Sequence, residues 1–371
     1  MSPNSRATLL KLHRWVGLSL AVLLLVQGTT GSLLVFRDEI DRAMHPELTL
    51  AAAGERRPVQ QLMDLVRASA PGATLQRVKV PEDPAHAWMF FMRLQSDAPY
   101  MVAVDPYRGE ILRQGSYLAW PSEWLFRLHD ALLAGRTGEI VVSVEGIALV
   151  FLAVFGVIVW WPGRRRLKSG FRILTGQGAD RAVRTSHRAV GAAVAIVLTM
   201  SGTTGALLIH RAALQEYLPM TPRPKFVVAP QDRAVLPVDA LLDRARATHG
   251  PLPLRELRFS GAAGQVVALY FQDETSLRRN ATRQYFYDAY AGRELGRYEP
   301  DAVPPLNTAY DWLYTIHTGR AGGWAGRAVI QCAGLSLVFF SVSGVWLWFS
   351  ARRQRRLRKL QAQARMARGP A

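Results

Sequence analysis

The chain has 371 residues, enough for two or three domains, and it carries a formal net charge of +18. Hydrophobic residues make up 49% of the chain and fall mainly in four blocks with basic residues beside them, which argues against a nucleic-acid partner and for a membrane protein. The single cysteine, Cys332, excludes an intramolecular disulfide and any cysteine-based iron–sulfur or zinc site.

The first predicted element is a membrane span at 15–36, so that a short cytoplasmic N-terminus and this span occupy 1–36. The block is about 20 residues long and nearly free of charge, enough to cross a hydrocarbon core about 30 Å thick. It is too long for the apolar region of a signal peptide, and FRDEIDR follows it in place of a small-residue cleavage site. We therefore expect it to remain as a helix.

An external segment follows at 37–138. It contains an amphipathic helix at 58–72, apolar-alternating residues that lead into a D-x-Y-x-G turn at 104–112, and the heptad EWLFRLH at 123–129. A helix combined with short alternating strands and a turn predicts a small α+β domain with an antiparallel sheet.

The second span is predicted at 139–161, and a basic loop at 162–188 follows it. Arg164, Arg165 and Arg166 come directly after this span, and a similar basic segment at 352–359 follows the last one. Short basic segments beside spans mark the cytoplasmic side. We therefore expect both chain ends and this loop inside, with membrane lipids as their partners.

The remaining chain repeats the same order. HRWVGLSLAVLLLVQGTTGSLL at 13–34 matches HRAVGAAVAIVLTMSGTTGALL at 187–208, and EWLFRLH matches DWLYTIH at 311–317. The predicted parts are a third span at 189–210, a second external α+β segment at 211–327, a fourth span at 328–350, and a basic cytoplasmic tail at 351–371. Both halves begin inside, so the predicted fold is an α-helical four-span bundle built from two parallel repeats. Matching glycines in the spans suit close contact between helices.

Four of the eight histidines occupy matching positions in the two halves. His13 matches His187 at the cytoplasmic start of two spans, and His129 matches His317 outside, about ten residues before the apolar blocks. Glycines that follow the outer histidines can break the helix and fold this segment back over the bundle. One pair of imidazoles is therefore expected at each face of the membrane. His210, at the outer end of the third span, is an alternative outer ligand.

Paired imidazoles on facing helices of a four-helix bundle can hold a haem iron from both sides. Zinc would need further ligands for a tetrahedral site, and a non-haem iron triad would need a carboxylate, which we expect none of the spans to bury. The candidate cofactor is therefore haem b, two per chain, with His13 and His187 as axial ligands of one iron and His129 and His317 of the other. An interfacial role is the alternative explanation for any single histidine.

Arginine and tryptophan residues extend these two candidate sites. Arg14 and Arg188 directly follow the inner histidines and either pair with haem propionates or extend to lipid headgroups. Trp124 and Trp312 each stand five residues before an outer histidine and are candidates for packing on haem. No acid–base pair or Ser/His/Asp set is present, so hydrolysis is not expected.

Several of these motifs resemble the PepSY-associated transmembrane family of bacterial inner-membrane proteins. They are LHRWVGL at 12–18, GTTG at 28–31 and 202–205, and LHDALLAGRTG at 128–138, and the resemblance covers nearly the whole chain. It implies two PepSY-like periplasmic domains, an inner-membrane location with cytoplasmic N- and C-termini, and the same four histidines as haem ligands. The second outer motif, HTGRAGGWAG, departs from the first because it lacks Leu-Leu.

Some members of this family are ferric-siderophore reductases that bind haem and pass electrons across the membrane. The resemblance therefore implies a haem-dependent oxidoreductase that reduces a ferric siderophore or other ferric chelate in the periplasm. No dinucleotide-binding fingerprint is present, so we expect a separate electron donor. One alternative is a non-enzymatic anchor whose PepSY-like domains bind or inhibit an envelope peptidase, and another is a haem electron-transfer subunit of a different enzyme.

Overall fold

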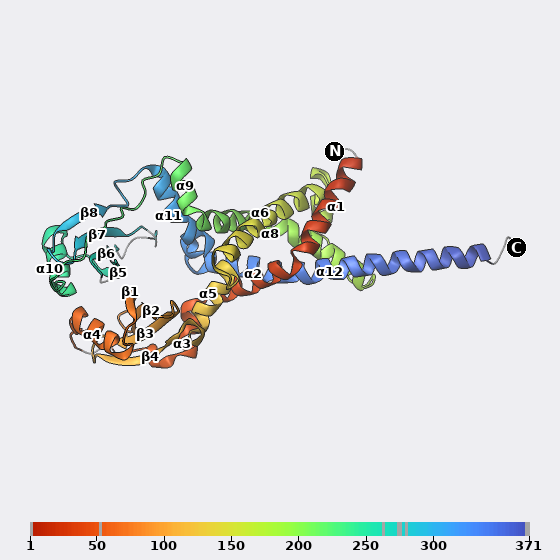
Figure 1. The fold of residues 1–371 in the computed structure, drawn as a ribbon. Helices are drawn as coiled ribbons and strands as arrows, with labels where there is room; N and C mark the ends of the chain where they lie inside the picture. The colour runs from red at the N-terminus through yellow and green to blue at the C-terminus, as the bar shows by residue number, and fades with distance from the viewer. Residues whose placement is uncertain (1–2, 52–53, 262–263, 273–276, 279–280, 368–371) are drawn as a thin grey trace. The chain divides into compact units, whose positions relative to one another are not determined.

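The computed structural model of the chain describes residues 3–51, 54–261, 264–272, 277–278 and 281–367 (Figure 1). The chain forms two compact units. The helical unit consists of residues 1–35, 126–209 and 316–371, and the sheet unit consists of residues 36–125 and 210–315. Each unit therefore takes residues from both halves of the sequence.

The helical unit contains the long apolar helices. These are α1 (Pro3–Ser19), α2 (Ala21–Leu34), α6 (Gly135–Trp160), α8 (Ala179–Ile209) and α12 (Gly323–Ala367), with a short α7 (Leu167–Gly170) between α6 and α8. In the described part of the chain, α6, α8 and α12 are each long and apolar enough to cross a membrane, and α1 with α2 would make a fourth span if this bent pair is one span.

The first predicted span is bent, because α1 and α2 meet at Leu20 at an angle of 65°. The Ser19 hydroxyl donates to the carbonyl of Trp15 at 2.9 Å, a bond to the residue four positions back that bends helices. The amide of Leu20 still bonds the carbonyl of Val16 at 3.1 Å, and the carbonyl of Leu20 accepts from Leu24 at 2.8 Å. Leu20 itself thus keeps both of its backbone hydrogen bonds at the bend.

Glycines bring the long helices of this unit together, as the sequence predicts. α2 packs on α12, and α6 packs on α8. A Cβ added to Gly28 would lie 2.8 Å from the carbonyl oxygen of Gly334, and one added to Gly202 would lie 2.7 Å from that of Gly146. Only glycine allows the backbones to approach this closely. The apolar core beside these crossings consists of Leu24, Leu149, Leu152, Ala153, Ala195, Leu198 and Ala333.

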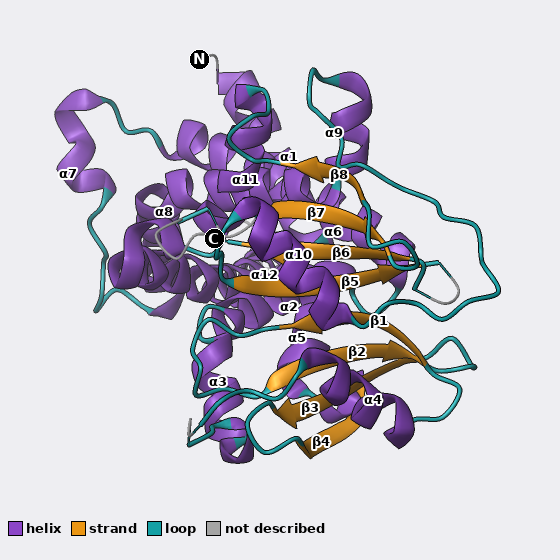
Figure 2. Ribbon diagram, turned by 90° about the vertical axis from the view of Figure 1, so that its left-hand side faces the viewer, coloured by secondary structure: helices purple, strands orange, loops and turns teal. Residues whose placement is uncertain are grey.

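The sheet unit contains one antiparallel sheet of eight strands in the order β4-β3-β2-β1-β5-β6-β7-β8 (Figure 2). The strands are β1 (Thr74–Lys79), β2 (Trp88–Arg93), β3 (Pro99–Asp105), β4 (Glu110–Ser116), β5 (Leu254–Ser260), β6 (Val266–Phe271), β7 (Arg283–Asp288) and β8 (Glu294–Tyr298). The sequence predicts two separate α+β domains. The structure instead joins their two four-stranded sheets through β1 and β5, with Val78 opposite Leu257.

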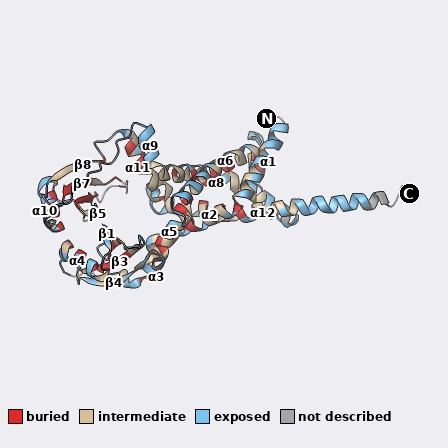
Figure 3. Ribbon diagram, in the orientation of Figure 1, coloured by how far each residue is buried: buried red, intermediate tan, exposed pale blue. Residues whose placement is uncertain are grey.

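Helices α4 (Val59–Ser69) and α10 (Val238–His249) cover one face of this sheet. Their buried side chains, among them Leu62, Val66, Leu241 and Leu242, share one core with alternate residues of the central strands. In Figure 3 exposed residues dominate α12 beyond the apolar part, and this helix continues into the predicted tail as far as Ala367. The remaining helices of this unit are α3 (Arg37–Met44) and α9 (Arg211–Tyr217), and α5 (Pro121–Ala131) and α11 (Pro305–His317) continue into the helical unit.

The predicted D-x-Y-x-G turn at 104–112 is confirmed, and the matching stretch YDAYAGREL at 287–295 forms the same turn in the second half. Asp105 accepts hydrogen bonds from the backbone amides of Tyr107 and Arg108 at 2.8 and 3.1 Å. Asp288 does the same for the amides two and three residues after it, at 2.8 and 3.2 Å. Each aspartate therefore has a structural role in a hairpin.

Candidate functional site

The outer histidines lie at the ends of α5 and α11, where the chain turns before the next long helix. Leu132 and Leu133, directly after α5, have φ values of 48° and 58°, and Gly319, after α11, has a φ of 74°. For the two leucines this left-handed conformation costs roughly 1–2 kcal/mol each, and such backbone strain gathers at functional sites. The predicted break between each histidine helix and the following span is therefore present.

Each outer histidine is held by the second threonine of a GTTG motif. Thr30 Oγ1 lies 2.9 Å from Nδ1 of His129, and Thr204 Oγ1 lies 2.9 Å from Nδ1 of His317. Each hydroxyl also donates its single hydrogen to the carbonyl four residues earlier, at 2.7 and 2.8 Å. Because that hydrogen is used, the hydroxyl accepts from the imidazole, and Nδ1 carries the ring proton. Nε2 then has a free lone pair, as in metal-binding histidines whose other nitrogen is hydrogen-bonded.

The last glycine of each GTTG motif makes room for the imidazole. A Cβ on Gly31 would lie 3.0 Å from Cε1 of His129, and one on Gly205 would lie 3.1 Å from Cε1 of His317. The first glycine of the motif forms the helix crossing described above. Sequence reasoning assigned this motif to helix contact alone and missed its contacts with the histidines, although its repetition beside repeated histidines was a visible signal.

The two outer imidazoles face each other. The ring centroids of His129 and His317 are 6.3 Å apart, with 49° between the ring planes. Two imidazoles that bind one metal ion from opposite sides, at about 2 Å each, have centroids about 6 Å apart. Burial lowers the pKa of His129 to about 3, with a further contribution from His317, and burial also lowers the pKa of His317. Both imidazoles are therefore neutral near pH 7, which is the form that binds metals.

The inner pair, His13 on α1 and His187 on α8, has a less regular environment. Nδ1 of His187 lies 2.7 Å from the Ser343 hydroxyl oxygen, whereas Nδ1 of His13 is buried and has no hydrogen-bond partner in the described part of the chain. A Cβ on Gly156 would lie 3.3 Å from Cε1 of His13, and one on Gly344 would lie 4.0 Å from Cε1 of His187.

The arginine and tryptophan candidates do not gather at the histidines in the same way. Arg14 is exposed, with its guanidinium 5.8 Å from the centroid of the Trp15 ring, and Arg188 is exposed and lines a separate cavity. Trp124 and Trp312 are half-buried, and the ring contacts of the described residues include none between them and an outer histidine. Five residues along a helix rotate a side chain by about 140° from its starting direction. Each tryptophan therefore points away from the histidine on its own helix.

His210, the alternative outer ligand, directly precedes α9 and belongs to the sheet unit. The imidazole that faces His129 is that of His317.

The expectation that no span buries a carboxylate is wrong. Glu145 lies within α6, is 2% exposed, and neither of its carboxylate oxygens has a hydrogen-bond partner in the described part of the chain. The sequence did contain a sign of this buried carboxylate, because Glu145 is an acidic residue within the apolar part of the second predicted span. An ionisable residue buried in a membrane span is expensive to place there and often has a function.

No three or more His, Cys, Asp or Glu side chains come together to hold a metal ion among the described residues. Two imidazoles alone leave a metal ion short of ligands unless another group, such as a porphyrin, supplies the rest. The outer pair therefore fits haem better than a bare metal ion.

Comparison with known proteins agrees with the motifs. A search of curated proteins gives no match to the chain. The model of the family described as PepSY-associated TM region matches residues 10–351, a range that contains both histidine pairs and both GTTG motifs. The chain therefore belongs to the PepSY-associated transmembrane family.

Proposed function

We propose that the protein is a haem-dependent reductase of the bacterial inner membrane, which passes electrons to the periplasmic side and reduces a ferric chelate such as a ferric siderophore. The observation that carries this proposal is the outer histidine pair. Its two neutral imidazoles have centroids 6.3 Å apart, and each has Nδ1 held by a threonine. A histidine that serves only the membrane interface requires neither a facing partner nor a fixed ring nitrogen.

In this proposal His129 and His317 hold one haem b, and His13 and His187 hold a second. Bound haem supplies one-electron chemistry, because its iron changes between the ferric and ferrous states. Thr30 keeps Nε2 of His129 unprotonated and fixes the direction of its ring, and the matching threonine does the same for His317. The proposal depends on the four histidines and needs no contact from Arg14, Arg188, Trp124 or Trp312, which do not gather at the histidines.

The substrate step needs no acid or base from the protein. One electron converts the ferric iron of the chelate to ferrous iron, which hard oxygen donors hold much less tightly, and the iron is released. The electron comes from a separate donor on the cytoplasmic side, such as a reduced carrier or quinol. The protein therefore serves as the electron path between two compartments.

We also propose four spans in two parallel repeats, with both chain ends in the cytoplasm. Two observations support this arrangement. The bent pair α1 and α2 contributes the same GTTG contacts as the straight helix α8, and basic residues follow α6 and extend along α12. The external segments at 37–138 and 211–327 would then be periplasmic.

The same histidine pair would serve a haem electron-transfer subunit that delivers electrons to a partner enzyme. An anchor that only binds or inhibits a peptidase would have no use for it. The reductase and the electron-transfer subunit differ in one respect. Only the reductase, purified and chemically reduced, transfers electrons to a ferric chelate without a partner.

The first experiment is a visible spectrum of the purified protein, oxidised and dithionite-reduced, with haem quantified per chain. We expect low-spin b-type bands and about two haems. His129→Ala and His317→Ala should each remove the same haem, and His13→Ala and His187→Ala should each remove the other. Addition of a ferric siderophore to the reduced protein, with a ferrous-iron indicator present, then measures electron transfer.

His86→Ala provides the matched control, because His86 lies in the sheet unit and belongs to neither proposed haem site. Its Nδ1 lies 3.1 Å from Oδ2 of Asp83. This variant should keep both haems. A colourless protein from haem-replete cells would rule out the proposal. Retention of full haem content in both His129→Ala and His317→Ala would rule out the outer pair as ligands.

A further inference from the structure

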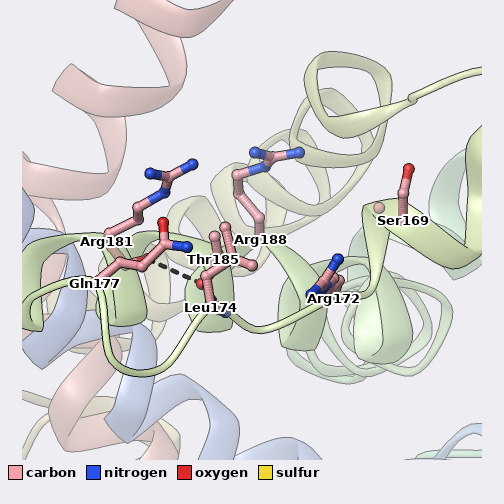
Figure 4. A pocket seen from close by; sticks show the side chains of 8 residues that line it. Ser169, Arg172, Leu174, Gln177, Arg181, Thr185 and Arg188 are labelled. Atoms are coloured by element: carbon pink, nitrogen blue, oxygen red, sulfur yellow. Dashed lines mark hydrogen bonds between the residues drawn. The ribbon is translucent and has the colours of Figure 1, made fainter.

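A cavity of about 370 Å³ lies beside the first turns of α8 (Figure 4). This volume is within the range of roughly 300–1,000 Å³ that is usual for small-molecule sites. The lining residues include three arginines and no acidic residue, and they are Ser169, Gly170, Arg172, Leu174, Gln177, Arg181, Thr185 and Arg188. The function proposed above gives the cavity as a whole no role.

The wall of this cavity is held in place by specific hydrogen bonds. The buried indole of Trp160 donates to the carbonyl of Gly170 at 3.0 Å, and the amide of Leu174 donates to the hydroxyl of Thr185 at 3.1 Å. A Cβ on Gly170 would lie 2.9 Å from the ring of Pro162. The loop between α6 and α8 is therefore fixed at two points beside the cavity.

The three arginines converge on the cavity from two directions. Arg181 and Arg188 lie seven residues apart on one face of α8, with Thr185 between them, and Arg172 comes from the loop. Figure 4 shows the side chains of Arg181 and Arg188 extending from the same side of the helix. The hydrogen bonds and ion pairs of the described residues give none of these three guanidiniums a carboxylate partner.

The one acidic residue nearby is directed elsewhere. The carboxylate of Asp180 accepts from Nε1 of Trp346 at 3.1 Å and from Nε2 of Gln354 at 3.0 Å, so α12 occupies both of its oxygens. Three guanidiniums therefore share a cavity without a counterion from the protein. Guanidinium forks match the oxygen geometry of phosphate and bind it through paired, charge-assisted hydrogen bonds.

We propose that this cavity is a binding site for a phosphate group, supplied either by an anionic lipid headgroup or by a soluble phosphate ester. Arg172, Arg181 and Arg188 neutralise the phosphate. Gln177 contributes amide hydrogens, and the remaining volume takes the group to which the phosphate is attached. This site is independent of haem, so its test does not rest on the reductase proposal.

The test uses the full chain in detergent and in nanodiscs. Isothermal titration with inorganic pyrophosphate measures the soluble source, and thermal melting in phosphatidylcholine nanodiscs, with and without phosphatidylglycerol, measures the lipid source. The variant is Arg172→Gln/Arg181→Gln. The matched control is Arg164→Gln/Arg165→Gln, which removes the same charge from two exposed residues of the same loop that do not line the cavity.

We expect the Kd for pyrophosphate to rise roughly tenfold or more in the cavity variant, because hydrogen bonds to charged groups are each worth about 1.5–3 kcal/mol. In the control variant the Kd should change less than about threefold. Weakened pyrophosphate binding supports a soluble ligand. A loss of the phosphatidylglycerol-dependent rise in melting temperature, confined to the cavity variant, supports a lipid.

Other outcomes overturn the proposal. These are equal losses in both double variants, no response of the wild type to either probe, or a lower haem content in the cavity variant, which would assign the arginines to a cofactor site. If the double variant does not give a single peak on size exclusion, Arg172→Gln and Arg181→Gln are tested singly against the same criteria.

Discussion

Among single residues, Thr30 is the direct test of the proposed outer haem site besides the histidines, because its hydroxyl lies 2.9 Å from Nδ1 of His129. Thr30→Val keeps the shape of the side chain but removes the acceptor for Nδ1–H of His129, and a buried donor left without a partner costs about 1–3 kcal/mol. We expect a 10–100-fold loss of haem affinity, the usual effect of removing a partner of this kind. Haem titration of the apoprotein measures it.

Two controls accompany this variant. Thr30→Ser keeps the hydroxyl and should bind haem nearly as the wild type does. Thr29→Val makes the same chemical change at the exposed neighbouring residue. Equal haem affinity in Thr29→Val and Thr30→Val would contradict the role assigned to Thr30.

Glu145 allows a second test at the residue scale. Its buried carboxyl group has no hydrogen-bond partner in the described part of the chain, and an unpaired polar group of this kind costs about 1–3 kcal/mol. Glu145→Leu should therefore raise the melting temperature in detergent. Glu139→Leu is the control on the same helix, because Glu139 is partly exposed and pairs with Arg136 at 2.8 Å. A lower melting temperature for Glu145→Leu than for the control would show that the carboxyl group is satisfied in the membrane.

At the scale of elements, the glycine crossings explain why α6 and α8 pack so closely. Gly202→Ala would place a Cβ 2.7 Å from the carbonyl oxygen of Gly146, so the two helices must separate and the protein should melt at a lower temperature. Gly191→Ala is the matched control on the same helix. Its Cβ would lie 3.9 Å from Phe340, an ordinary contact, and alanine is favoured over glycine in a helix by about 1 kcal/mol. The two variants should therefore shift the melting temperature in opposite directions, and a shift in the same direction would contradict this packing.

Hydropathy located the long helices but not their ends or their bend. The predicted third span at 189–210 corresponds to a helix that begins ten residues earlier, at Ala179, because polar residues outside the hydrocarbon region can remain helical. The bend at Leu20 lies beside Ser19, whose hydroxyl bonds the carbonyl of Trp15. Serine makes such bonds in many straight helices, so the sequence alone gave no reason to expect a bend here. The histidine pairing was predictable because each half repeats the same local motif.

At the scale of the whole molecule, the feature that the sequence did not reveal is the joining of the two external segments. Arg77 lies directly opposite Arg258 where β1 pairs with β5, an arrangement that pairing preferences disfavour. The guanidinium of Arg77 lies over the ring of Phe91, and that of Arg258 lies over the ring of Tyr270. Glu256 lies 3.7 Å from the guanidinium of Arg77 and 2.6 Å from that of Arg258. The carboxylate between them offsets the repulsion between the two positive charges. These contacts are far apart in the chain and have no local signature. The sequence therefore gives no reason to assign β1 and β5 as partners.

The two halves also cap each other's helices across this join. Asp239, at the start of α10, accepts hydrogen bonds from the backbone amides of Val59 and Gln60 at the start of α4, both at 2.9 Å. Gln60 accepts in return from the amide of Val238 at 3.2 Å. A carboxylate that satisfies two free amides at a helix N-terminus also interacts favourably with the helix dipole. The start of each helix thus depends on the other half of the chain.

Asp239→Ala should therefore destabilise α4, which lies 180 positions away in the sequence, by about 0.5–2 kcal/mol. Hydrogen exchange measured by mass spectrometry should show faster exchange in the peptide that contains the first turn of α4, since its amides lose their acceptor. Asp243→Ala serves as the control, because Asp243 is exposed on the same helix and its Oδ1 pairs with Nη1 of Arg246 in its own half, at 3.5 Å. If exchange in α4 is the same in both variants, the two halves are joined by strand pairing and core packing alone. If only Asp239→Ala changes it, the sheet unit folds as one structure whose two halves require each other.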